Sequence, residues 1–111
     1  MKNFLVYVED KTNFYAGEEQ RLVSEERKDE ANIMRIRQNV YGIAKSMYEV
    51  AEKLSPEDIR GDVIKRLEGI LSAWESNYER VKEHNDTEKI LVEETKLGTL
   101  REIFGYLETA E

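Results

Sequence analysis

One spacing pattern constrains this chain more than any other feature. Apolar side chains recur at alternating steps of three and four residues, at Ile33, Ile36, Val40, Ile43, Met47, Val50 and Leu54. Such alternation is typical of a helix that packs lengthwise against other helices. We therefore predict that this heptad ladder is the core-facing seam of a long helix.

Composition agrees with a single helical domain over residues 1–111. That length is enough for one compact unit and too short for two ordinary ones. Charged residues make up 37% of the chain, and there is one proline. An average soluble domain has roughly 25% charged residues. A high charge content with little proline is typical of a helical bundle.

Three further segments carry helical spacing, so the fold class we predict is all-α, an antiparallel bundle of three to four helices. Residues 3–23 form the first segment, and a short strand over 4–8 is the competing interpretation. A lone strand would find no partner, which favours helix. The apolar positions of the three segments are Phe4, Val8, Tyr15 and Leu22, then Val63, Leu67, Ile70, Trp74 and Val81, then Ile90, Leu97, Leu100, Phe104 and Leu107.

Local signals predict where these helices begin. Asp29 is the predicted N-cap of the ladder helix, because aspartate side chains accept hydrogen bonds from free helix N–H groups. Ser55, followed by proline and two acids, is the predicted N-cap of the next helix. In an alternative interpretation, that helix begins after Asp62. Asn85 or Asp86 is expected to cap the last helix.

Charge and cysteine content exclude several classes of function. The chain carries 24 acidic and 17 basic residues, a net charge of −7, which disfavours nucleic acids and anionic membranes as partners. It has no cysteine, which is consistent with a reducing cytoplasm. The apolar run at 4–8 is too short for a signal peptide or a membrane span. We expect a cytoplasmic protein.

The residues also predict no catalytic, metal or cofactor site. There is one histidine, and no Glu-x-x-His pair of the kind that holds di-iron centres in bundles. Adjacent carboxylates on a helix point about 100° apart, so we interpret them as parts of solvent-exposed faces. Glu93 is the one acid at a seam position. We expect it to reach solvent or pair with Lys89 or an arginine, and a ligand or proton role is the alternative.

Two sets of residues suggest an interface. Met34, Tyr41 and Tyr48 lie seven residues apart beside the heptad ladder, and Gly98 and Gly105 share one face of the last helix. This stripe is wider than one neighbouring helix can cover, which predicts that part of it meets a second subunit or a protein partner, and the glycines would permit a close approach. We therefore expect a homodimer. If the stripe is internal, it is the inner face of a four-helix core.

Residues 27–32 (RKDEAN) and 82–91 (KEHNDTEKIL) resemble segments of small helical proteins of unassigned function in Gram-positive bacteria. The resemblance implies the bundle fold and a bacterial cytoplasmic origin, and it implies no activity or site. The function we predict is a non-catalytic protein-interaction or adaptor module that self-associates. The alternatives are an acidic regulator or inhibitor that binds a basic surface of a partner, and, less favoured, a bundle that binds a small ligand.

Overall fold

The computed structural model describes residues 1–109, and these contain four α-helices and no strand. The helices are α1 (Lys2–Ser24), α2 (Lys28–Leu54), α3 (Ile59–Glu83) and α4 (Thr87–Thr109). The predicted all-α fold is confirmed, and the alternative of a strand over residues 4–8 is wrong. The predicted buried positions of α1, which are Phe4, Val8, Tyr15 and Leu22, are all at most 4% exposed.

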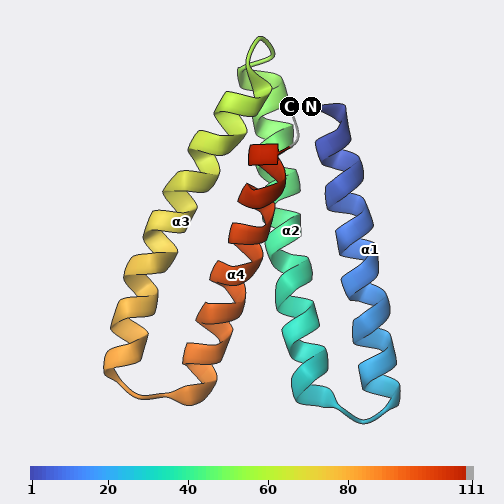
Figure 1. Ribbon diagram of the computed structural model, residues 1–111, viewed down its shortest axis with the longest axis vertical. Coiled ribbons are helices and arrows are strands. Elements are labelled where there is room, and N and C mark those ends of the chain that lie inside the picture. Colours follow the sequence, from blue (N-terminus) through green and yellow to red (C-terminus); the bar gives the residue numbers. More distant parts are fainter. Residues whose placement is uncertain (110–111) are drawn as a thin grey trace.

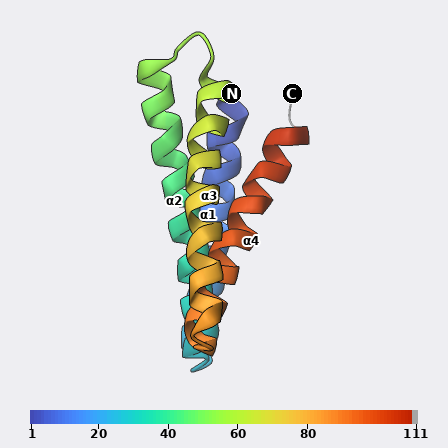
Figure 2. The ribbon, with the colours of Figure 1, turned by 90° about the vertical axis from the view of Figure 1, so that its left-hand side faces the viewer.

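The helices form two antiparallel hairpins, α1–α2 and α3–α4, that splay apart (Figure 1). The hairpins meet near the α2–α3 connection, which we call the closed end. They diverge towards the connections 25–27 and 84–86, which we call the open end. α2 packs against each of the other three helices. Towards the closed end, α4 leans away from α2 and α3, on the side where α1 lies (Figure 2). There, the Tyr106 ring stacks on Tyr7 with 3.9 Å between ring centroids.

The buried face of α2 differs from the predicted one. Of the heptad ladder, Val40 alone is buried; Leu54 is 67% exposed, and the other five side chains are half-buried. Four of the buried positions are instead the residues that directly follow ladder positions, namely Tyr41, Ala44, Tyr48 and Ala51. The buried face is therefore turned by about 100°, one residue step of a helix, from the ladder.

The reason for this rotation is the position of α1. α1 lies along most of α2, whereas α3 approaches α2 at the closed end and diverges from it (Figure 1). The face of α2 towards α1 is thus covered over most of its length, and α4 adds to that cover away from the open end. The small side chains of Ala44 and Ala51 leave room there, and the rings of Tyr41 and Tyr48 fill it.

Two of the predicted helix starts are wrong. α2 begins at Lys28, so Asp29 lies in its first turn, where an acid still favours the positive end of the helix dipole. Ser55 ends α2, and its carbonyl accepts from Asp58 N at 3.0 Å to close a turn around the proline. Asp58 then caps α3 by accepting a hydrogen bond from Gly61 N at 3.1 Å. The predicted N-cap at Ser55 and the alternative start after Asp62 are therefore both wrong for α3.

The open end has the cap that the sequence predicts. Asp86 accepts from Lys89 N at 3.2 Å, which confirms it as a cap of α4. Both connections there also contain a residue in the left-handed region, Glu26 with φ of 61° and Asn85 with φ of 52°. Asparagine adopts this conformation readily, whereas glutamate does so at a cost.

Two leucines test which side chains form the core. Leu67 is fully buried in α3, so Leu67→Ala should lower the free energy of unfolding by about 2–5 kcal/mol, because it removes apolar contacts and leaves a cavity. Leu54→Ala, at the end of the ladder, should change it by less than about 0.5 kcal/mol. Urea unfolding followed by circular dichroism measures both. Equal losses of unfolding free energy in the two variants would show that the ladder residues belong to the core.

Candidate functional site

Six polar or aromatic side chains converge where α1, α2 and α4 meet. α1 contributes three residues at four-residue spacing, which places them on one face of the helix. α2 contributes two at the same spacing, and α4 contributes one. We call this the tyrosine–glutamate cluster, and its members are Tyr7, Lys11, Tyr15, Arg37, Tyr41 and Glu102.

Glu102 is the acceptor on which the cluster converges. The Tyr41 hydroxyl donates to Glu102 Oε1, and the Tyr15 hydroxyl donates to the same oxygen at 3.1 Å. Lys11 Nζ lies 3.2 Å from it. Because the single hydroxyl proton of Tyr41 is used in this way, the Tyr7 hydroxyl must be the donor in its 2.8 Å bond to Tyr41. Three helices are thus tied to one carboxylate.

These bonds fix the charge states of the cluster. Burial alone would raise the pKa of Glu102, but the hydrogen bonds from Tyr41 and Lys11 outweigh it and hold the pKa below its usual value. Burial raises the pKa of Tyr41, and the hydrogen bond to Glu102 raises it further. At neutral pH the cluster therefore contains an ionised Glu102, a charged Lys11, and neutral Tyr7 and Tyr41.

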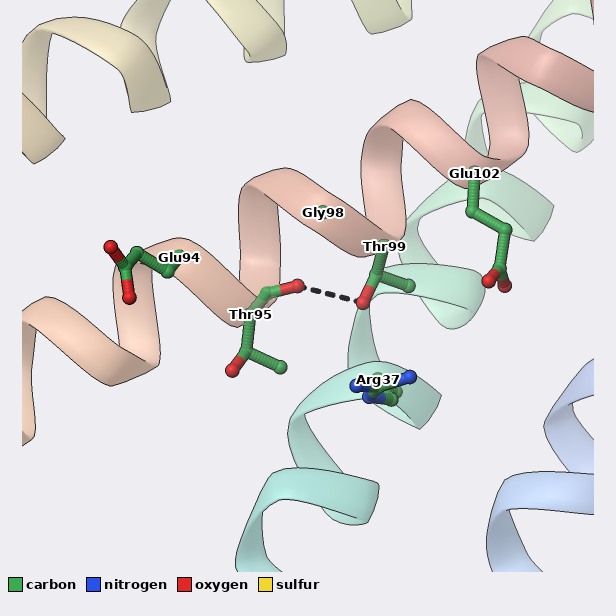
Figure 3. A pocket seen from close by; sticks show the side chains of 6 residues that line it. All are labelled: Arg37, Glu94, Thr95, Gly98, Thr99 and Glu102. Atoms are coloured by element: carbon green, nitrogen blue, oxygen red, sulfur yellow. Dashed lines mark hydrogen bonds between the residues drawn. The ribbon is translucent and has the colours of Figure 1, made fainter.

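An open pocket of about 310 Å³ runs along α4 beside this cluster. We call it the Arg37 pocket, and its lining residues are Arg37, Glu94, Thr95, Gly98, Thr99 and Glu102. Figure 3 shows Arg37 on α2 below Thr99, with Glu94 and Glu102 towards the two ends of the strip. The pocket therefore combines one cation with carboxylates on either side.

A second depression, of about 260 Å³, lies between α2 and α4 at the open end. We call it the α2–α4 groove. Ile33, Leu91 and Val92 form its apolar part, while Asp29 and Glu88 carry its charge. Leu91 is 51% exposed, which is high for a leucine, because α2 and α4 diverge towards the open end.

The structure corrects the predicted interface. Tyr41 is 0% exposed and Tyr48 is 3% exposed within a single chain, so neither has surface to give to a second subunit. They are core, as the alternative interpretation had it, and Met34 is half-buried beside them. Gly98 and Gly105 are exposed, and no side chain of the described residues lies within 4 Å of a Cβ built on either.

Glu93 is paired within the bundle. It is 8% exposed, and it accepts from Asn77 Nδ2 at 2.9 Å and from Lys96 Nζ at 3.1 Å. The expectation of a pair holds, but the partners are neither Lys89 nor an arginine. Lys96 also lies over the Trp74 ring, 4.7 Å from its centroid. This set of contacts neutralises the one acid of the α4 seam.

Glu102 offers a test by pH. Glu102→Gln should lower the free energy of unfolding by about 1–2 kcal/mol at pH 7, because it removes charge-assisted hydrogen bonds. A carboxyl whose pKa is lowered by folding stabilises above its unfolded pKa, usually 4.5, and loses that effect as pH falls through the folded value. The difference between the two proteins should therefore shrink from pH 7 to pH 3. Urea melts at each pH measure it.

A matched control is Glu75→Gln. Its exposed ion pair with Arg101 should contribute less than about 0.5 kcal/mol. A Glu102 effect that stayed constant down to pH 3, or that was no larger than the Glu75 effect, would contradict the role of the cluster.

A substitution at Gly98 tests whether another subunit packs against the exposed face of α4. Gly98→Ala should raise the free energy of unfolding by up to about 1 kcal/mol, because alanine is the better helix former and its Cβ meets nothing. Gly61→Ala should lower it instead, since its Cβ would collide with the capping carboxylate of Asp58. Thermal melts compare the two variants. A loss of stability in Gly98→Ala would show that another subunit packs closely against this face.

Within residues 1–109, no helix is long and apolar enough to cross a membrane. The same residues contain no group of three or more His, Cys, Asp or Glu side chains arranged to hold a metal ion. No protein-family model matches the chain, and neither a curated protein nor a solved structure shows significant similarity to it.

Proposed function

We propose that this chain is a non-catalytic, cytoplasmic interaction module that binds a basic amphipathic helix of a partner protein in the α2–α4 groove. The observation that carries this proposal is the groove itself, an apolar depression with an acidic rim where two helices diverge. Grooves between helices are a common docking surface for the apolar face of a partner helix.

The apolar part of the groove supports a helix as occupant. Leu91 is half-exposed and lies beside Ile33 and Val92, so these residues present a short apolar floor. Burying such side chains yields about 25 cal/mol for each Å² removed from water. An amphipathic helix offers an apolar stripe of comparable width, with side chains at intervals of three and four.

Charge selects the kind of helix. Asp29 and Glu88 lie at the groove, and the exposed acids Glu26, Glu83 and Asp86 lie at the open end, where the exposed bases include Lys28 and Lys89. The whole chain has a net charge of −7. A partner with lysine or arginine beside its apolar stripe would be attracted, and an acidic helix would be repelled.

The proposal is non-catalytic because the tyrosine hydroxyls, Lys11 and Glu102 of the polar cluster are already paired with one another. The hydroxyl protons of Tyr7, Tyr15 and Tyr41 are all committed to partners within the cluster, and Lys11 is paired with Glu102. These bonds support a structural tie between helices rather than a reacting centre, which needs a base within reach of a substrate.

A labelled model peptide of leucine and lysine in an amphipathic helical pattern tests the proposal by fluorescence anisotropy. We expect the native protein to bind it more tightly than a scrambled peptide of the same composition, which has no apolar stripe. Leu91→Glu should weaken binding of the amphipathic peptide at least about tenfold, because it removes the exposed floor of the groove.

The substitution also separates groove binding from simple charge attraction. Leu91→Glu makes the protein more negative, so attraction by net charge alone would strengthen. Leu54→Glu is the matched control. Leu54 is 67% exposed at the closed end, and this substitution adds the same charge. Tighter binding by both variants, or equal binding of the scrambled peptide, would contradict the proposal.

Self-association remains a second proposal, with a narrower basis than the sequence suggested. Its supporting observation is the exposed face of α4 where Leu91, Gly98 and Gly105 follow one another at seven-residue spacing. Sedimentation equilibrium over a wide concentration range distinguishes a monomer from a dimer. If Leu91→Glu dissociates a dimer, the two copies use this face of α4 and compete with the partner helix.

A further inference from the structure

We propose that the Arg37 pocket is a binding site for a small zwitterion of the amino-acid class. The ligand's carboxylate would bond to the Arg37 guanidinium, and its ammonium group would face the acceptors along α4. The inference is independent of the peptide groove, because none of the residues that line the Arg37 pocket lines the groove.

Arg37 is a cation without a counter-ion in the described part of the chain. It is half-buried, and its one hydrogen bond to the described residues is from Nη1 to the Tyr15 hydroxyl oxygen at 3.4 Å, which is a long contact. Its Nε is buried without an acceptor, and no carboxylate of residues 1–109 pairs with it. Sheltered arginines are normally paired, and their planar fork suits a carboxylate.

The Arg37 side chain is also held in place. Its guanidinium carbon lies 5.4 Å from the centroid of the Tyr15 ring, a cation–π contact that orients the guanidinium plane. Tyr15 is in turn fixed by its hydrogen bond to Glu102. A guanidinium that is positioned before the ligand arrives loses less entropy on binding.

The α4 side of the pocket presents acceptors only. Thr95 donates its hydroxyl proton to the Leu91 carbonyl at 2.8 Å, and Thr99 donates its own to the Thr95 carbonyl at 2.7 Å (Figure 3). Their oxygens therefore offer lone pairs to the pocket. Glu94 and Glu102 are acceptors by nature when ionised.

This pattern selects a ligand with both charges. A simple anion at Arg37 would have two carboxylates, Glu94 and Glu102, in the same pocket, and a simple cation would meet Arg37. A zwitterion satisfies both sides at once. A volume of about 310 Å³ lies at the lower end of the range for ligand pockets, which favours a small molecule. Gly98 leaves the wall open, because no side chain stands over it.

The test is a titration of the isotope-labelled protein, followed by backbone amide NMR and by calorimetry. The probes are glycine, β-alanine and γ-aminobutyrate, which vary the charge separation, with acetate and methylammonium as the two half-ligands. We expect the amides of Thr95, Gly98 and Thr99 to shift with at least one zwitterion. That zwitterion should bind at least about tenfold more tightly than acetate, since it alone satisfies the acceptors.

Variants assign the binding to Arg37. Arg37→Met keeps the aliphatic stem and should abolish the shifts, whereas Arg35→Met should leave them unchanged. Arg35 lies on the same helix but is 61% exposed and paired with Glu19. If Arg37→Met does not fold, Glu94→Gln serves instead, because Glu94 is exposed and its loss should weaken zwitterion binding several-fold without affecting acetate.

Three results would overturn the inference. One is the absence of shifts at these amides with every zwitterion at concentrations up to about 100 mM. Another is acetate binding as tightly as the zwitterions, which would leave the acceptors without a role. The third is binding that persists in a folded Arg37→Met protein.

Discussion

One carboxylate holds the two hairpins in their relative positions. Glu102 of α4 receives hydrogen bonds from Tyr15 of α1 and Tyr41 of α2 and an ion pair from Lys11, so a single side chain connects three helices. The apolar core alone does not specify such an angle between hairpins, because hydrophobic contact is not directional. The directional hydrogen bonds to Glu102 therefore explain how the two hairpins keep their splayed arrangement. The Arg37 pocket and the α2–α4 groove exist because the hairpins are splayed.

The sequence predicted the number and type of elements well, because helical periodicity is local information. The apolar positions of α1 are all buried as expected, and Asp86 caps α4. The orientation of α2 about its own axis could not be read in the same way. A helix that contacts three others has no single favoured face, and the ladder competed with the neighbouring stripe of alanines and tyrosines. Which stripe is buried depends on where α1 lies, which is tertiary information.

The site was less predictable than the fold. The four-residue spacing of Tyr7, Lys11 and Tyr15 is visible in the sequence, and it would have marked a polar strip along the apolar face of α1. Glu102 gave no such signal, because an acid between an arginine and an isoleucine on a helix is ordinary. Arg37 likewise looked like one of many surface charges. Their significance arises from a meeting of segments far apart in the chain, which spacing rules do not reach.

The long sequence separation within the cluster has a consequence for folding. Most helix contacts join neighbours in a hairpin, and such local contacts form early because little loop entropy is lost. The bond between Tyr15 and Glu102 spans 87 positions, so it can close only after both hairpins exist and have met. The bonds to Glu102 therefore form late in folding. They lower the rate at which the folded hairpins separate more than they raise the rate of folding.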